Sequence, residues 1–280
     1  MSQFDLVILG GGSGGYAAAL RGAQLGLSVA LIEADKVGGT CLHRGCIPTK
    51  ALLHSAEIAD GAREGSHFGV KSTFDGIDMA GVNAYKDGVI NKLHKGLSGL
   101  VKSRNITYIE GYGKLVAKDT VEVNGTRYTG KNVILATGSY AKTLPGLEID
   151  GEKIITSDHG TKMSYVPKSV IVLGGGVIGC EFASVWKSFG SDVRIIEGLP
   201  HLVPLEDESS SKLLERAYRK RGINFEVGVR FSGVSETATG IKVTLEDGRD
   251  FEADILLVAV GRGPSSTGVG FEEIGVKMDR

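Results

Sequence analysis

The sequence predicts an α/β protein in which one strand–turn–helix unit occurs twice. The first copy is FDLVILGGGSGGYAAAL, where an apolar run at residues 6–9 leads into glycines and then into a helix of small residues. The second copy, SVIVLGGGVIGCEFASVW, has the same order. In both copies the next apolar run ends in a glutamate, at the same distance from the first glycine. Buried strands that alternate with helices are typical of a parallel sheet with helices on its faces.

Each glycine of the repeated turn has a physical reason. The first glycine makes the tight turn, the second lets the backbone approach a pyrophosphate, and the third allows the helix to pack close to the strand. The helix N-terminus then offers N–H groups to the phosphates, and the glutamate accepts hydrogen bonds from ribose hydroxyls. We therefore expect two Rossmann-like dinucleotide-binding domains. Their candidate binding residues are Gly10, Gly12, Gly15 and Glu33 in the first and Gly174, Gly176, Gly179 and Glu197 in the second.

The repeat continues beyond the turns and sets the expected domain boundaries. Asn124-Gly125 and Asp247-Gly248 are both hairpin signals, and each is followed by an apolar strand that ends in a glycine, Gly138 or Gly261. A parallel sheet with helices and a β-hairpin or meander crossover is expected in each domain. We assign residues 1–147 to the first domain and 148–268 to the second, with 269–280 beginning a return to the first.

The first copy contains additional residues with a long helical pattern at 79–104. Its apolar positions recur at helical spacing and are expected in the core: Val82, Tyr85, Val89, Leu93, Leu97 and Leu100. Cys180, inside the second glycine turn, is expected to be a small packing residue.

The composition of the 280 residues excludes several classes of protein. Hydrophobic residues make up 41%, charged residues 23%, and the net charge is −1, so neither a nucleic-acid surface nor a polybasic membrane arm is expected. The N-terminus MSQFDLVILGGG lacks the pattern of a signal peptide. Three cysteines are too few for a secreted disulfide scaffold. We expect a cytoplasmic protein with no nucleic-acid or membrane partner.

The acidic residue of the second domain indicates which nucleotide it binds. A carboxylate at Glu197 favours ribose hydroxyls and repels a 2′-phosphate. No arginine pair follows it in EGLPHL. The second domain is therefore expected to bind NAD(H) rather than NADP(H).

Two cysteines, Cys41 and Cys46, lie close together in GGTCLHRGCIPTK. A zinc site needs about four ligands, and no second cysteine pair is present to complete one. A structural disulfide is disfavoured in a reducing cytosol. Lys50, four residues after Cys46 on an expected helix, brings a cation to the same face, and a nearby positive charge favours a thiolate. A redox-active disulfide is the interpretation that we favour over inert thiols and a metal site.

The same segment resembles the active-site segment of the flavoprotein disulfide reductases, most closely that of the dihydrolipoamide dehydrogenases. The resemblance extends over the whole chain and includes VILATGS, GGGVIGCEFA, EGLPHLVP and VAVGRGP. It implies FAD and NAD as cofactors. It also implies that Cys41 is the interchange thiol and Cys46 the thiolate beside the flavin. Lys50 and Glu181 match the ion pair that flanks the flavin in the family.

The resemblance also implies further cofactor-binding residues. Val177 matches the position that gates nicotinamide entry, and Gly261 ends the last strand of the second domain. The expected lining of the FAD site consists of Gly39, Thr40, Gly113, Ala136, Thr137, Gly138 and Ser139.

The resemblance implies an activity and a set of partners. The family oxidises dihydrolipoamide to lipoamide and reduces NAD⁺ to NADH as part of 2-oxoacid dehydrogenase complexes, with lipoyl domains as substrate. Its chains form homodimers through a further domain that carries a His–Glu acid/base pair. We expect this chain to be the N-terminal FAD/NAD portion, incomplete for the full reaction and monomeric on its own. The alternatives are a related disulfide reductase and a non-catalytic nucleotide-binding fragment.

Overall fold

The computed structural model describes residues 2–279, which divide into two compact units. Unit 1 comprises residues 2–47, 88–140 and 263–279, and unit 2 comprises residues 48–87 and 141–262. Each unit contains one of the two glycine turns. The mixture of helices with mainly parallel sheets confirms the predicted α/β class.

Residues 2–141 contain the elements of unit 1 together with α3, η1 and the start of α4, which lie mainly in unit 2. The strands are β1 (Ser2–Leu9), β2 (Val29–Glu33), β3 (Thr107–Glu110), β4 (Gly113–Ala117), β5 (Thr120–Val123), β6 (Thr126–Leu135) and β7 (Ser139–Ala141). The helices are α1 (Ser13–Gln24), α2 (Gly39–His43), α3 (Cys46–Glu64), the 3₁₀ turn η1 (Gly65–Phe68) and α4 (Met79–Ser103).

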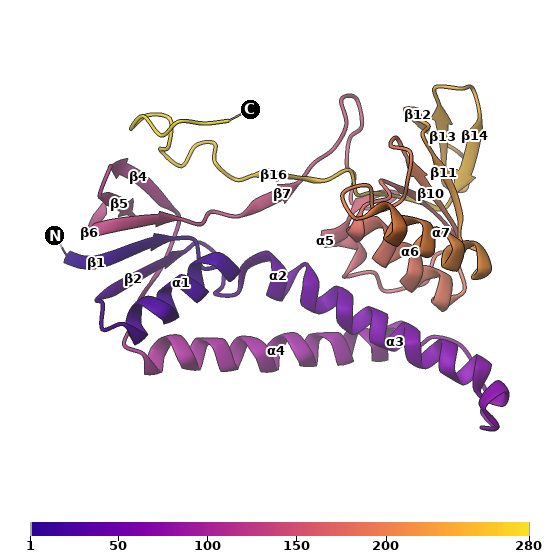
Figure 1. Cartoon of the computed structure of the whole chain (residues 1–280), viewed down its shortest axis with the longest axis horizontal. Helices are drawn as coiled ribbons and strands as arrows, with labels where there is room; N and C mark the ends of the chain where they lie inside the picture. Colours follow the sequence, from indigo (N-terminus) through magenta and orange to yellow (C-terminus); the bar gives the residue numbers. More distant parts are fainter. Residues whose placement is uncertain (1, 280) are drawn as a thin grey trace. The chain divides into compact units, whose positions relative to one another are not determined.

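The sheet of unit 1 has six strands in the order β3-β2-β1-β6-β5-β4. Strands β3, β2, β1 and β6 are parallel to one another, whereas β5 and β4 pair in the antiparallel direction. Alternate side chains of β1 enter two separate clusters, Leu6 and Ile8 with α1 and Val101 of α4, and Val7 and Leu9 with the β4–β5 hairpin. Figure 1 shows α1 on one side of β1 and the β4–β5 hairpin on the other. This alternation is what a strand covered on both faces requires.

The remaining elements belong mainly to unit 2. The strands are β8 (Ile154–Thr156), β9 (Ser169–Leu173), β10 (Asp192–Glu197), β11 (Asn224–Val227), β12 (Phe231–Glu236), β13 (Ile241–Leu245), β14 (Asp250–Ala253), β15 (Ile255–Val258) and β16 (Arg262–Pro264). The helices are α5 (Ser157–Gly160), α6 (Val177–Phe189) and α7 (Glu208–Lys220).

Unit 2 repeats the plan of unit 1 with a separate antiparallel sheet. Five parallel strands have the order β11-β10-β9-β15-β8, and β12-β13-β14 form a three-stranded meander. Val170 and Val172 of β9 pack with α6 and α7 on one face, while Ile171 and Leu173 pack with the meander on the other. The glycine turn, between β9 and α6, lies at the carboxyl end of β9.

The predicted hairpin at Asn124-Gly125 is confirmed. The two residues join β5 to β6 with φ values of 50° and 78°, so both adopt the left-handed conformation that a two-residue hairpin turn requires. Asp247-Gly248 lies in the turn between β13 and β14, where Gly248 has a φ of 85°. Residues next to each other in the chain were sufficient to predict both turns.

The expectation that the apolar stripe of α4 is core is wrong for half of its members. Tyr85, Leu93 and Leu100 are 45%, 43% and 49% exposed. The packed side chains instead include Val101 and the buried Lys86, whose Nζ donates to the carbonyl oxygen of Thr161 at 2.7 Å. Helical spacing defines a face, but the neighbouring elements decide whether that face is covered.

A membrane-spanning helix is not found among residues 2–279: none of their helices combines sufficient length with sufficient apolar character.

Candidate functional site

The glycine turn of unit 1 brings several chain segments into close contact. Gly10 has a φ of 108°, and a Cβ placed on it would lie 2.1 Å from the carbonyl oxygen of Ala136. A Cβ on Gly15 would lie 1.7 Å from the carbonyl oxygen of Gly10, so α1 can begin only if this residue is glycine. Gly39 has a φ of 58°, and a Cβ there would lie 2.6 Å from the Cα of Gly12. Main-chain atoms therefore approach one another closely at this turn, and the side chain of Glu33 also lies against it, 3.0 Å from a Cβ placed on Gly11.

The predicted FAD-lining residues of unit 1 are distributed around the same sheet edge. Ala136 donates its N–H to the carbonyl oxygen of Leu9, and Thr137 follows it beside the turn. Gly138 has a φ of 78°, and its carbonyl oxygen accepts the N–H of Ser265 at 3.0 Å. The remaining members are Thr40 in α2, Gly113 at the start of β4 and Ser139 at the start of β7.

The two glutamates at the ends of the second strands have matching hydrogen bonds. Glu33 accepts the N–H of Gly11 at 2.6 Å and the N–H of Asp35 at 2.9 Å. Glu197 accepts the N–H of Gly175 at 2.6 Å and the N–H of Leu199 at 2.8 Å. Each carboxylate is therefore held by two backbone donors beside its glycine turn. A carboxylate fixed in this way is oriented to accept hydrogen bonds from vicinal hydroxyl groups of a ribose.

A cavity of about 520 Å³ lies at the glycine turn of unit 2. Gly174, Gly176, Val177, Glu197 and Gly261 all line it, so the structure brings together most of the residues that the sequence assigns to the second nucleotide. A Cβ on Gly176 would meet no heavy atom within 4 Å, so the turn is open toward the cavity. Gly179 lies against the backbone instead, where a Cβ would be 1.9 Å from the carbonyl oxygen of Gly174.

The segment of residues 198–207 forms part of the cavity wall. Val203 has a φ of 45°, a strained conformation for a β-branched residue. Its N–H donates to the carbonyl oxygen of Gly175 at 2.7 Å. The buried Glu215 of α7 accepts the N–H of Leu202 at 3.2 Å, which supports the segment from the side of the helix. Strain held by surrounding contacts is frequent at binding sites.

Arg230, which was not predicted from the sequence, also lines this cavity. It follows β11, the strand that pairs with β10, whose last residue is Glu197. In open α/β sheets, ligands bind beyond the carboxyl ends of adjacent parallel strands. Residues 228–230 follow the carboxyl end of β11, and this position could have predicted that they lie at a ligand site.

The cysteine segment comprises α2, a short turn and the start of α3. Cys41 lies in α2, and Cys46 is the first residue of α3, where the helix dipole stabilises a negative charge. A Cβ on Gly45 would lie 3.1 Å from the carbonyl oxygen of Thr40, so the turn passes close to α2.

Lys50 lies one turn after Cys46 in α3, and its Nζ donates to Oε1 of Glu181 at 2.5 Å. Glu181 belongs to α6, whose first residue Val177 lines the cavity. The Lys50 side chain is 57% exposed and that of Glu181 22% exposed. The two predicted members of the ion pair are therefore in direct contact although 131 residues separate them in the chain.

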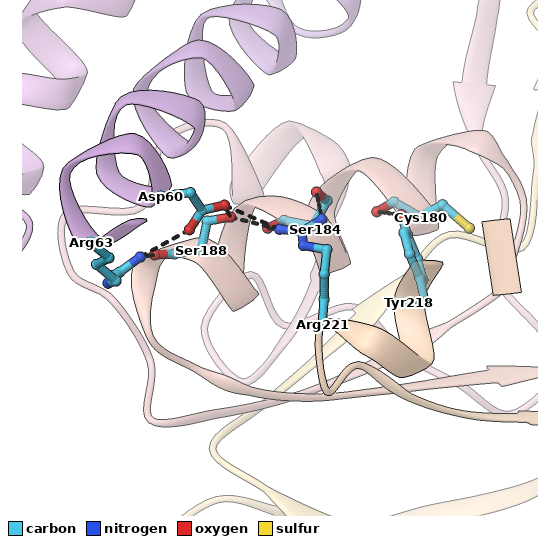
Figure 2. A network of polar contacts seen from close by, with 7 residues as sticks. All are labelled: Asp60, Arg63, Cys180, Ser184, Ser188, Tyr218 and Arg221. Carbon is cyan, nitrogen blue, oxygen red and sulfur yellow. Dashed lines mark hydrogen bonds and ion pairs between the residues drawn. The ribbon is translucent and has the colours of Figure 1, made fainter. Parts of the chain in front are cut away.

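A second polar network joins α3 to α6 near the end of α3 (Figure 2). Asp60 accepts a hydrogen bond from the hydroxyl of Ser188 at 2.6 Å and pairs with Arg221 at 3.5 Å. Arg221 also donates to the hydroxyl groups of Ser184 and Ser188, each at 2.7 Å. Arg63 donates to Asp60 at 3.0 Å and to the carbonyl oxygen of Ser188 at 2.5 Å. We call Asp60, Arg63, Ser184, Ser188 and Arg221 the helix-joining network.

Unit 1 contains a contact between two histidines that the sequence did not predict. His43, the last residue of α2, has its ring 5.0 Å from that of His94 in α4, and its Nε2 lies 3.0 Å from the carbonyl oxygen of Val37. Burial lowers the pKa of His94, and electrostatic interactions with His43 and Lys36 lower it further. Within residues 2–279, no group of three or more His, Cys, Asp or Glu side chains is arranged to hold a metal ion.

Two α/β units, each with a glycine turn and a fixed carboxylate, define a protein with two dinucleotide-binding folds and an associated cysteine pair. Residues 4–280 match the family model described as pyridine nucleotide-disulphide oxidoreductase. The chain therefore belongs to the pyridine nucleotide-disulphide oxidoreductase family. This membership confirms the resemblance found in the sequence.

Individual relatives cover nearly the whole chain. Leghemoglobin reductase from Vigna unguiculata is 40% identical over 288 residues, which cover 99% of this chain and 55% of the relative. Mitochondrial dihydrolipoyl dehydrogenase from Pisum sativum is also 40% identical over 288 residues, covering 99% and 58%. The crystal structure of LpdA from Mycobacterium tuberculosis is similar with a TM-score of 0.90 and 27% identity, covering 100% and 63%. The chain thus spans between 55% and 63% of the length of these proteins.

Proposed function

We propose that this chain supplies the nucleotide-binding and dithiol portion of a dihydrolipoamide dehydrogenase. The whole enzyme would oxidise dihydrolipoamide to lipoamide and reduce NAD⁺ to NADH. The single observation that carries the proposal is the course of α3, which begins at Cys46 and one turn later presents Lys50 to Glu181 of α6. The name of the relative from Pisum sativum supports the choice of substrate.

The residues of unit 1 fit FAD. Gly12 and Gly39 approach each other closely without side chains of their own, and Glu33 is oriented beside the turn by two backbone donors. The helix N-terminus at α1 would receive the pyrophosphate. The proposed contacts in unit 1 are Gly10, Gly12, Gly15, Glu33, Gly39, Thr40, Gly113, Ala136, Thr137, Gly138 and Ser139. Lys50, in the part of α3 that is assigned to unit 2, is a further proposed contact.

The residues of unit 2 fit NAD(H). The cavity is about 520 Å³, within the range of cavities that hold small-molecule ligands, and Glu197 is fixed at its wall. The proposed contacts are Gly174, Gly176, Val177, Gly179, Glu197 and Gly261. When bound, FAD would take up two electrons from the dithiol and NAD⁺ would accept them as a hydride.

Cys41 and Cys46 would undergo thiol–disulfide exchange with the substrate. In their disulfide form, one thiolate of dihydrolipoamide attacks the sulfur of Cys41 and displaces Cys46 as a thiolate. The second substrate thiol then attacks the substrate sulfur in the mixed disulfide, which releases lipoamide and leaves Cys41 reduced. Two electrons have passed to the protein, and the protons of the two substrate thiols have left. Lys50 and Glu181 would flank the bound cofactors.

The proposed partners of the whole enzyme are the lipoyl domains of 2-oxoacid dehydrogenase complexes, and its proposed assembly is a homodimer. The proposed location is the cytoplasm, where cellular thiols keep exposed cysteine pairs reducible.

Thiol counting after treatment with NADH tests the proposal. The chain is oxidised, loaded with FAD, treated anaerobically with NADH, and then alkylated and weighed by mass spectrometry. We expect two additional alkyl groups per chain, because one NADH and one proton reduce one disulfide to two thiols. The Cys41→Ser variant should gain none, since it cannot form the pair.

The matched control is Cys180→Ala, which removes a cysteine outside the proposed pair. It should still gain two alkyl groups upon NADH treatment. An FAD-loaded wild-type chain whose thiol count is the same with and without NADH would contradict the proposal. That result would favour a non-catalytic nucleotide-binding function.

A further inference from the structure

Arg230 occupies a position in the unit 2 cavity that the proposed function does not explain. It lines the same cavity as Glu197 and Gly198, and a Cβ placed on Gly198 would lie 3.9 Å from the Cγ of Arg230. The stem of the arginine therefore passes beside the residue that follows the ribose-binding carboxylate. The inference below rests on the proposal that this cavity binds a nicotinamide dinucleotide.

Backbone hydrogen bonds fix the position from which this side chain extends. The N–H of Val229 donates to the carbonyl oxygen of Glu197 at 3.2 Å, and the N–H of Gly228 to that of Leu199 at 2.8 Å. The carbonyl oxygen of Arg230 itself accepts the N–H of Glu246 at 2.9 Å. Arg230 is thus attached on one side to the strand end that carries Glu197 and on the other side to the meander.

The charges around the cavity give Arg230 a distinct role. Three carboxylates line it, those of Glu197, Glu206 and Glu246, and within the described chain Arg230 is the one cationic side chain among the lining residues. Among residues 2–279 the guanidinium of Arg230 makes no hydrogen bond or ion pair, in contrast to Glu197, which already accepts two backbone N–H groups. An exposed guanidinium is well suited to bind a phosphate through two parallel hydrogen bonds.

We propose that Arg230 is a specificity-determining residue that faces the 2′ position of the adenosine ribose and acts there against Glu197. The carboxylate favours a 2′-hydroxyl and repels a 2′-phosphate, whereas the guanidinium attracts the phosphate. The preference of the cavity for NAD(H) is therefore smaller than Glu197 alone would produce. Removal of the carboxylate exposes an existing phosphate-binding side chain.

The adenosine fragments 5′-AMP and 2′,5′-ADP test this assignment, because they differ only in the 2′-phosphate. Their dissociation constants are measured by calorimetry for the full chain, Arg230→Gln, Glu197→Ala and the double variant. We expect Glu197→Ala to bind 2′,5′-ADP about tenfold more tightly than the wild type, because a repulsive charge is lost while Arg230 remains. The double variant should lose that gain. Both variants without Glu197 should bind 5′-AMP more weakly, because the ribose hydroxyls lose their acceptor, whereas Arg230→Gln should bind 5′-AMP within about threefold of the wild type.

Two further measurements make the test specific to Arg230. Arg230→Lys in the Glu197→Ala background should retain part of the gain, because it keeps the charge without the bidentate geometry. Arg216→Gln, which removes an exposed arginine of α7 outside the cavity, should leave both dissociation constants unchanged. Arg230→Gln alone should weaken binding of 2′,5′-ADP even with Glu197 present, so the test does not depend on the fold of the Glu197→Ala variant.

The outcomes separate this inference from the proposed function. If 5′-AMP binds and Arg230→Gln leaves 2′,5′-ADP affinity unchanged in both backgrounds, the role of Arg230 is wrong while the nucleotide site stands. If neither fragment binds the wild-type chain, both the nucleotide site and the role of Arg230 are overturned.

Discussion

At the scale of single residues, the three cysteines differ in their surroundings. Cys180 is 5% exposed, its Sγ lies 3.3 Å from the carbonyl oxygen of Gly175, and burial raises the pKa of its thiol to about 12. Its carbonyl oxygen accepts the hydroxyl of the buried Tyr218 at 2.7 Å (Figure 2). These contacts confirm that Cys180 is a packing residue. Cys46 is exposed and Cys41 is partly exposed.

The difference in surroundings predicts a difference in reactivity. In the reduced native chain at pH 8, the thiols of Cys41 and Cys46 should react readily with a disulfide reagent. The thiol of Cys180 should react only after denaturation. The raised pKa keeps Cys180 protonated at this pH, and a thiol without its thiolate is a poor nucleophile. The measurement is a time course of released chromophore with and without denaturant. Cys180→Ala should leave the native count at two, and three fast thiols in the native wild type would contradict the prediction.

At the scale of elements, the packing of α3 against α6 depends on polar groups at both ends. Glu181, Ser184 and Ser188 recur at helical spacing on α6, a helix that is otherwise largely buried and apolar. Lys50 bonds to the first of these residues, and Asp60 bonds to the last. The helix-joining network therefore holds the register of α3 against α6, and with it the position of Lys50.

Removal of one carboxylate from this network should destabilise the protein measurably. Asp60→Ala leaves the hydroxyl of the buried Ser188 without its acceptor and Arg221 without its counter-charge. We expect the free energy of unfolding to fall by about 1–3 kcal/mol, measured by urea titration. Glu57→Ala is the matched control on the same helix. Its carboxylate is 78% exposed and pairs with the exposed His54, so a change within about 0.5 kcal/mol is expected. Equal effects of the two substitutions would show that the network does not hold the helices together.

At the scale of the whole molecule, the unfolding of unit 2 can be followed by itself, because the one tryptophan of the chain lies in that unit. Trp186 belongs to α6, is 3% exposed, and packs against Phe182 in the core of unit 2. Tryptophan fluorescence therefore reports on unit 2. A ligand of the unit 2 cavity should change the thermal transition that this signal follows.

ADP-ribose, which lacks the fluorescent reduced nicotinamide, is a suitable ligand for this measurement. At one hundred times its dissociation constant, a ligand that binds only the folded state stabilises that state by about 2.7 kcal/mol. For a unit of this size the midpoint of the tryptophan transition should rise by roughly 5–10 °C. Ribose 5-phosphate, which lacks the adenine, should produce a much smaller rise. An unchanged midpoint with ADP-ribose would place the nucleotide outside unit 2.

The sequence by itself determined the features whose causes are local. The glycines of both turns, the glutamates that end the second strands and the Asn124-Gly125 hairpin all satisfy backbone requirements within a short stretch of chain. A positive φ or a close backbone approach excludes most residue types, so the residues themselves reveal the local conformation. The α/β class and its repetition followed from these signals.

Only the tertiary structure decided which distant side chains meet. Tyr85 and Leu93 have the helical spacing of core residues, yet they are exposed, because coverage depends on elements elsewhere in the chain. Asp60 and Arg221 are 161 residues apart and form an ion pair because α3 packs against α6. Arg230 reaches the unit 2 cavity because β11 pairs with β10, and no local sequence pattern around Glu197 predicts that pairing. Long-range pairing is set by the cooperative packing of whole elements, and it is therefore not encoded at any single position of the sequence.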